Sequence, residues 1–169
     1  MSLTISEMRL APNAAKAAQL IMKIHPQVVF TSGRRDFRDQ TRVMANNVAH
    51  YGPAWLKDTY KDAKMVRALM TFVEEHPEGA QNPQFLANGF YGELTTYFPD
   101  MLVKFPHVRG DAFDIQWPRL ENGQIDSPQG EVLCNTILTL PVELGLQLLL
   151  KREGKLDVIH AQFNHAVEV

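Results

Sequence analysis

Cysteine is almost absent from the sequence, since Cys134 is the only one in 169 residues. A single cysteine excludes an intramolecular disulfide and any zinc site built from several thiolates. An excess of charge of one sign is missing too, because 17 Lys and Arg residues face 19 Asp and Glu residues, for a net charge of -2. We therefore expect no nucleic acid as a partner and no electrostatic attraction to an anionic membrane.

Long apolar runs are lacking as well. No uninterrupted apolar stretch approaches ~18 residues, so we expect no membrane insertion. The first twenty residues show no basic start followed by an apolar block, and we therefore expect no signal peptide and synthesis in the cytoplasm. The chain has an ordinary globular composition, with 45% hydrophobic and 21% charged residues, and its length suits one domain with a full core.

Apolar residues recur at steps of three and four in several segments, which predicts helices. These segments are 13–24, 36–51, 54–60, 62–76 and 130–140. Pro26 and Pro77 stop the first and the fourth of them. Asn82-Pro83 and Asn88-Gly89 are interpreted as helix breakers. The stretch from 53 to 99 is therefore expected to be a helical insertion.

Short β-branched and aromatic runs predict the strands. Residues 28–31 form one such run, ended by Ser32-Gly33, and residues 112–117 form another. Two apolar runs, 144–150 and 156–163, flank a charged turn that contains glycine, which predicts a hairpin. Helices early, strands mostly late and no alternating βαβ pattern indicate an α+β fold with a small antiparallel sheet and flanking helices. We expect one domain over 1–169.

The most informative stretch is KFPHVRGDAFDIQW, where His107 and Asp114 flank a glycine turn. Imidazole and carboxylate are both good zinc ligands, and a catalytic zinc takes about three protein ligands. His160 in KLDVIHAQF is the best third candidate. Asp157, three residues before it, is a candidate general base for a zinc-activated water, provided that a bend or a strand end brings the two side chains together. His165 is expected to be exposed rather than a ligand.

Two arginines follow the first strand, in Thr31-Ser32-Gly33-Arg34-Arg35. A guanidinium presents a planar fork of donors, so Arg35 is the first choice for binding a substrate carbonyl or carboxylate. Each signal also fits an ordinary structural role: a solvated arginine at a helix start, a structural histidine in a strand, or an aspartate at a hairpin turn. Residue patterns alone leave these alternatives open.

Three segments together resemble the D-alanyl-D-alanine carboxypeptidase-like zinc peptidases, which share the Hedgehog/DD-peptidase fold. They are SGRRDFRDQ, FPHVRGDAFD and DVIH, and they occur in the family's order. The resemblance implies His107, Asp114 and His160 as ligands of Zn2+ and Asp157 as the catalytic base. It also implies Arg35 as a catalytic and substrate-binding arginine. Arg34, Ser32 and Gln40 complete the expected substrate-binding set.

Asp157 in place of glutamate, followed by His-x-Gln, is most similar to phage endolysins that cut between L-alanine and D-glutamate in peptidoglycan stem peptides. The resemblance implies a monomeric lysis enzyme that is made in the host cytoplasm and acts on the wall in the periplasm after release. Cleavage at the terminal D-Ala-D-Ala bond is a second reading. A non-catalytic virion or wall-binding module with a structural zinc is a third. The sequence departs from the family at Phe105, where a serine is usual.

Overall fold

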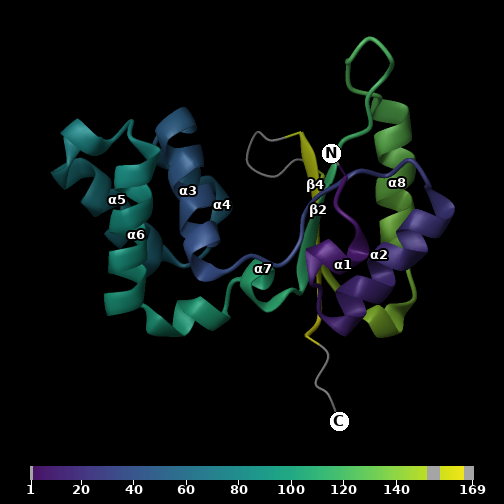
Figure 1. Cartoon of the computed structure of the whole chain (residues 1–169), viewed down its shortest axis with the longest axis horizontal. Helices are drawn as coiled ribbons and strands as arrows, with labels where there is room; N and C mark the ends of the chain where they lie inside the picture. The colour runs from purple at the N-terminus through teal and green to yellow at the C-terminus, as the bar shows by residue number, and fades with distance from the viewer. Residues whose placement is uncertain (1, 152–156, 166–169) are drawn as a thin grey trace. The chain divides into compact units, whose positions relative to one another are not determined.

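The computed structural model describes residues 2–151 and 157–165. The chain divides into two compact units, residues 1–34 with 109–169 and residues 35–108, which we call the sheet unit and the helical unit. The described residues form eight α-helices and one four-stranded antiparallel sheet, which confirms the α+β class (Figure 1). Within these same residues, every helix is too short or too polar to cross a membrane.

The sheet unit is built on four strands: β1 (Phe30–Ser32), β2 (Ala112–Gln116), β3 (Leu146–Leu150) and β4 (Val158–Phe163). Their order is β1-β2-β4-β3, and each neighbouring pair is antiparallel. The predicted hairpin is confirmed as β3 and β4. The predicted turn between them falls partly on residues 152–156 and the predicted strand start on Leu156, all of which lie outside the described residues.

One face of the sheet carries the core of this unit. Phe113 and Ile115 of β2 and Ile159 and Ala161 of β4 are fully buried. They pack with α2 (Pro12–Ile24) and α8 (Ser127–Leu138), which lie side by side against the sheet in Figure 1. Successive side chains of a strand point to opposite faces, so the residues between these apolar ones face away from the core.

An irregularity in β1 determines which of its residues lies on the face of the sheet opposite the apolar core. Phe30 pairs with Ile115, but Ser32 pairs with Asp114, so β1 contains one residue more than β2 over this interval. A bulge of this kind turns the following side chain, and bulges are frequent next to functional sites. The extra residue in β1 brings Ser32 directly opposite Asp114.

A short N-terminal helix, α1 (Ile5–Met8), secures the turn after β1. Thr4 and Glu7 form a capping box, and the hydrogen bonds from Thr4 lower the pKa of the Glu7 carboxyl. The carbonyl of Met8 accepts a hydrogen bond from the Arg34 backbone at 2.8 Å. A Cβ at Gly33 would lie 2.5 Å from that carbonyl oxygen, so only glycine allows this approach.

Several predicted boundaries in the sheet unit shift. The first strand covers 30–32 rather than 28–31, although the backbone N–H of Gln116 in β2 still donates to the carbonyl of Val29 at 2.9 Å. The α8 helix begins at Ser127 rather than at residue 130, because the Asp126 side chain accepts the Gln129 N–H and caps the helix earlier. It ends at Leu138 and is followed by the 3-10 turn η3 (Val142–Leu144).

The helical unit consists of helices joined by short turns. They are α3 (Phe37–Tyr51), α4 (Ala54–Thr59), α5 (Ala63–Glu75), η1 (Pro77–Gly79), α6 (Pro83–Tyr97) and η2 (Pro99–Val103). Their fully buried apolar side chains make a separate core. The prediction that residues 53–99 are helical is confirmed for the described residues.

The prediction that Asn88-Gly89 breaks the helix is wrong. The α6 helix continues from Pro83 to Tyr97 through both residues. A Cβ at Gly89 would lie 1.9 Å from Cζ of Phe72 on α5. The glycine lets the Phe72 ring lie directly on the α6 backbone, so its role is close packing between two helices rather than helix termination.

Candidate metal centre

The first candidate ligand, His107, lies on α7 (Pro106–Arg109), a single helical turn that leads into β2. The connection passes through Gly110, whose φ of 82° favours glycine. The carbonyl of Gly110 accepts a hydrogen bond from the Ala11 backbone at 2.9 Å. The predicted glycine turn between His107 and Asp114 is therefore confirmed, and a contact to the N-terminal segment holds it in place.

The other two candidate ligands are neighbours across the sheet. Asp114 on β2 pairs with His160 on β4 in the strand register, and Nδ1 of His160 lies 2.9 Å from Oδ1 of Asp114. Both side chains are on the face opposite the apolar core, and both residues are buried. One proton can bridge this short contact. A metal ion would bind the imidazole in its neutral form and the carboxylate in its ionised form, because metal ligands must be deprotonated.

His107, Asp114 and His160 form a group that can hold a metal ion. Each offers one ligand atom, and the three atoms lie within 4.8 Å of one another. The residues are 6%, 5% and 4% exposed, so the group has little access to solvent. Buried polar groups are expensive unless they are paired or coordinate a metal. The grouping of His160 with His107 and Asp114, which precede it by more than forty residues, is as predicted.

The donor set fits zinc. Two imidazole nitrogens and one carboxylate oxygen match the three protein ligands of catalytic zinc sites, which leave one coordination position for water or substrate. Softer metals prefer thiolates, and the single cysteine, Cys134, is buried among the apolar residues of α8 in a different cluster. Burial raises the pKa of its thiol, which further disfavours a thiolate ligand there.

Asp157, the candidate base, lies immediately before β4. Its carbonyl accepts a hydrogen bond from the Trp117 backbone at 2.9 Å, which continues the ladder of β2 and β4 by one residue. Its carboxylate oxygen Oδ2 is 3.2 Å from Nη2 of Arg119. Arg119 also donates to the carbonyl of Gly123 at 2.8 Å, so its guanidinium is held on both sides.

The two arginines that precede α3 differ in burial and in their contacts. Arg34 is exposed and Arg35 is half-buried. The backbone N–H of Arg35 donates to the carbonyl of His107 at 3.0 Å, so this turn lies next to the first ligand. Nη1 of Arg35 is 3.5 Å from Oε1 of Gln40, and the buried Gln40 in turn donates to the hydroxyl of Tyr60 at 3.2 Å.

A buried ionic group beside the metal ligands escaped prediction. Asp111 is fully buried, and its Oδ1 lies 2.7 Å from Nδ1 of His165. Its Oδ2 is 2.6 Å from Nε of Arg109, a close ion pair whose angles do not make a hydrogen bond. His165 is 54% exposed in its side chain, as predicted, and it is not in the metal-binding group. The sequence signal was an acidic residue inside the central motif, at a place that varies in the resembled family.

Arg119 also escaped prediction, because it lies in a polar loop where a solvated arginine is the usual expectation.

Phe105, which stands where the resembled family has serine, is 4% exposed. Its ring contacts Tyr60 edge to face at 5.9 Å and lies 6.3 Å from the ring of Phe37. The side chain therefore contributes to the apolar core of the helical unit instead of offering a hydroxyl to the ligands.

No protein-family model, curated protein or solved structure matches this chain. The class of protein is therefore defined by the fold and the site alone. It is an α+β protein with a small antiparallel sheet, and His107 of α7, Asp114 of β2 and His160 of β4 form a buried group that could hold a metal ion. Within the sheet unit Ser32 pairs with Asp114 and Asp114 pairs with His160, and within the helical unit the backbone N–H of Arg35 donates to the carbonyl of His107.

Proposed function

We propose that this protein is a zinc-dependent peptidase that hydrolyses an amide bond in the stem peptides of bacterial peptidoglycan. The single observation that carries the proposal is the buried group of His107, Asp114 and His160, with ligand atoms within 4.8 Å of one another. The proposal includes a Hedgehog/DD-peptidase type of fold over the whole chain, with residues 53–99 as an insertion. It also includes the phage endolysin type of specificity, between L-alanine and D-glutamate.

The chemistry follows from the residues around the group. Zinc, when bound, lowers the pKa of a coordinated water toward neutrality and polarises a substrate carbonyl. Asp157 takes the proton of the attacking water and later gives it to the leaving amine. Arg119 holds the carboxylate of Asp157 from one side, at 3.2 Å, and so limits its rotamers. This positioning role for Arg119 complements the role of Asp157 as base.

Arg35 supplies the positive charge for the substrate. A guanidinium binds a carboxylate or a developing oxyanion through two parallel N–H bonds. The side chain of Gln40 touches Nη1 of Arg35, and Tyr60 holds Gln40 in turn. This chain of contacts orients the guanidinium in advance, so less side-chain entropy is lost when the substrate binds. Arg34 and Ser32 are proposed as further substrate contacts.

The decisive experiment compares metal content and wall hydrolysis in the same preparations. We expect wild-type protein to contain one zinc ion per chain and to release soluble peptides from purified sacculi. A chelator should abolish release and added zinc should restore it. Asp157→Ala should keep the metal and lose hydrolysis by at least about a hundredfold, the size of a general base contribution. Full hydrolysis by a zinc-loaded Asp157→Ala variant would refute the proposed mechanism.

Mass spectrometry of the released products separates the readings of the site. New N-terminal D-glutamate indicates cleavage after L-alanine, as we propose, whereas free D-alanine indicates a D-Ala-D-Ala carboxypeptidase or dipeptidase. A protein that binds zinc and sacculi but releases nothing would be a virion or wall-binding module with a structural metal. Asp157 and Arg119 favour catalysis, because a structural site needs no positioned base.

The proposed cellular context follows from the proposed reaction. A wall peptidase of this kind is made in the host cytoplasm and reaches the periplasm when the phage opens the inner membrane. We propose that it acts as a monomer, with the stem peptide as its partner.

A further inference from the structure

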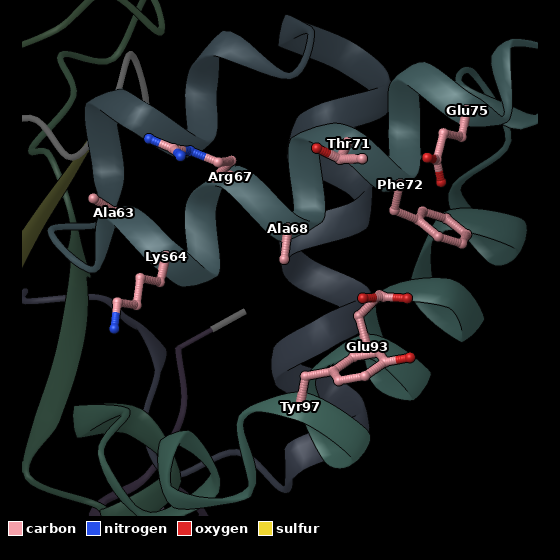
Figure 2. Close-up of a pocket in the computed structure, with 9 residues that line it drawn as sticks. All are labelled: Ala63, Lys64, Arg67, Ala68, Thr71, Phe72, Glu75, Glu93 and Tyr97. Carbon is pink, nitrogen blue, oxygen red and sulfur yellow. The ribbon is translucent and has the colours of Figure 1, made fainter.

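A hollow of about 640 Å³ lies on the helical unit, along the exposed side of α5 and α6 (Figure 2). It is distinct from the metal-binding group, and every residue that lines it comes from α5 or α6. Ala68, Thr71 and Phe72 of α5 form its middle. Tyr97 of α6, which is 67% exposed, stands across from them. An aromatic ring with a polar tip, left open to solvent beside a hollow, is a common anchor for a ligand.

The hollow has opposite charges at its two ends. Lys64 and Arg67 lie at one end, and Glu75 and Glu93 lie at the other (Figure 2). None of these four side chains has an ion pair or a side-chain hydrogen bond to another residue in the described ranges 2–151 and 157–165. Lys64 and Glu75 are eleven positions apart on one helix, about 16 Å at 1.5 Å per residue, so they cannot neutralise each other.

The charge order on α5 opposes the stability of the helix. Lys64 lies in its first turn and Glu75 is its last residue, with no acidic residue in the first turn and no basic residue in the last. A helix is stabilised by the reverse arrangement, because its N-terminal end carries partial positive charge and its C-terminal end partial negative charge. Lys64 and Glu75 therefore add to the field of the helix, whereas the N-cap residue Asp62 accepts hydrogen bonds from the backbone of Lys64 and Met65 and offsets part of it. A ligand beside α5 meets basic side chains at one end of the hollow and acidic side chains at the other.

We propose that this hollow binds a second stem peptide of the peptidoglycan substrate, outside the metal centre. The identity of the ligand rests on the proposed function. A stem peptide carries free carboxylates and, where its third residue is a diamino acid, an ammonium group. About five extended residues span roughly 16 Å, the distance between the charged ends. Carboxylates of the peptide pair with Lys64 and Arg67, its ammonium pairs with Glu75 or Glu93, and its backbone lies along Thr71, Phe72 and Tyr97.

Such a site keeps the enzyme on its substrate. Peptidoglycan presents many identical stem peptides on one insoluble polymer, so a second weak contact turns rebinding into an intramolecular event. The overall retention then exceeds that of either site alone. The helical unit, whose core makes no use of these exposed charges, gains a role in substrate capture.

The test is a charge swap that leaves the net charge unchanged, Lys64→Glu with Glu75→Lys. The parent protein for this test is the full chain with Asp157→Asn, which should not digest the wall during the measurement. The charge swap is added to that parent. We expect binding to purified sacculi, measured by co-sedimentation, to weaken about tenfold, the loss of two or more charge contacts. The swap also places charges in the order that the helix favours, so its unfolding midpoint should rise, and misfolding cannot explain lost binding.

A matched control exchanges the exposed pair Asp39 and Arg42 on α3, as Asp39→Arg with Arg42→Asp, again without a change in net charge. It should bind sacculi like the parent. Equal binding by the α5 swap and the parent would overturn the proposal. Equal weakening of binding by both exchanges would overturn it too. So would a dimer of the parent protein that the α5 swap dissociates, because the hollow would then bind a second copy of the chain. A soluble stem tetrapeptide with a diamino acid should compete for the parent and not for the swap.

Failure of the proposed function and failure of this site can be told apart. If wild-type protein releases no peptide from sacculi but the α5 swap still weakens binding, the catalytic proposal fails and the binding site stands. If wild-type protein cleaves sacculi and the α5 swap binds them normally, the catalytic proposal stands and the binding site on α5 and α6 fails.

Discussion

The sheet unit and the helical unit differ in where their polar groups lie. In the sheet unit Ser32, Asp111, Asp114 and His160 are all buried. The core of the helical unit is apolar, with Gln40, Thr41 and His107 as its buried polar residues, and its unpaired charges face solvent in the hollow of α5 and α6. Burial of ionisable groups is expensive unless they are paired or bind metal. Both units therefore bury polar groups, but the two carboxylates buried among the described residues, Asp111 and Asp114, lie in the sheet unit.

The difference also separates two ways of holding a protein together. In the helical unit the backbone hydrogen bonds join residues close in sequence, although α3 and α6, which pack against each other, are distant in the chain. In the sheet unit, strands that are far apart in sequence must pair before the candidate ligands meet, as the 46-residue separation of Asp114 and His160 shows. Four predictions test this contrast, from the largest expected effect to the smallest.

Removing a ligand should have the largest effect. We expect His160→Ala to lower the affinity for zinc by more than about a hundredfold, because even changes to outer-shell groups cost 10- to 100-fold. Competition with a chromophoric chelator measures this affinity. His50→Ala, at an exposed histidine of α3, is the control and should bind zinc normally. Unchanged affinity in His160→Ala would remove that residue from the site.

Removing the buried carboxylate of Asp111 should destabilise the sheet unit. Asp111→Ala leaves Arg109 and His165 without their common partner, and because both of these side chains reach solvent we expect a loss of about 1–3 kcal/mol. Urea unfolding measures the free energy of unfolding. The control is Asp39→Ala, which breaks an exposed pair with Arg42 and should cost less than about 1 kcal/mol. A similar small loss for both would mean that Asp111 is not held as an ion.

Two glycines of α6 should respond in opposite directions. Gly89→Ala forces a Cβ into the Phe72 ring and should cost about 1–3 kcal/mol. Nothing lies within 4 Å of a Cβ at Gly92, so Gly92→Ala should stabilise the protein by up to about 1 kcal/mol through helix propensity alone. Thermal unfolding of the two variants side by side checks this. A stable Gly89→Ala would contradict the close approach of α5 and α6.

The smallest effect concerns Cys134. Burial raises the pKa of its thiol, so the folded protein should resist alkylation at neutral pH and react after unfolding in urea. The sign of the pH dependence follows, because the folded state favours the neutral thiol. Its contribution to stability is present below the thiol pKa of the unfolded chain and is lost as the pH rises above it. Rapid labelling of the folded protein would contradict the burial.

Some features follow from the sequence because they depend on local patterns. Helical spacing predicted α2, α3 and α5 to within one or two residues, and the motifs predicted His107, Asp114 and His160 as one group. Gly89 was misassigned because a glycine that ends a helix and one that admits a neighbouring ring look alike in one sequence. The ring that decides between them, Phe72, lies on a different helix.

The remaining features could not be predicted because they depend on tertiary contacts. Nothing in the sequence near Arg119 indicates Asp157 as its partner, 38 residues away. The pairing of Asp111 with His165 spans 54 residues. The extra residue in β1 shows only in the register against β2, which no pattern within residues 28–32 records. The catalytic role, the wall substrate and the identity of the metal stay predictions.

The pairing of Asp114 with His160 has a consequence for the order of folding. Closing a long loop lowers chain entropy before any contact compensates for it, so such pairs form late, whereas helices form early. The helical unit can therefore collapse first, and the metal-binding group comes into being only when β4 docks on β2. Metal uptake then reports the completion of folding, and a chain that has not closed its sheet offers zinc only scattered single ligands.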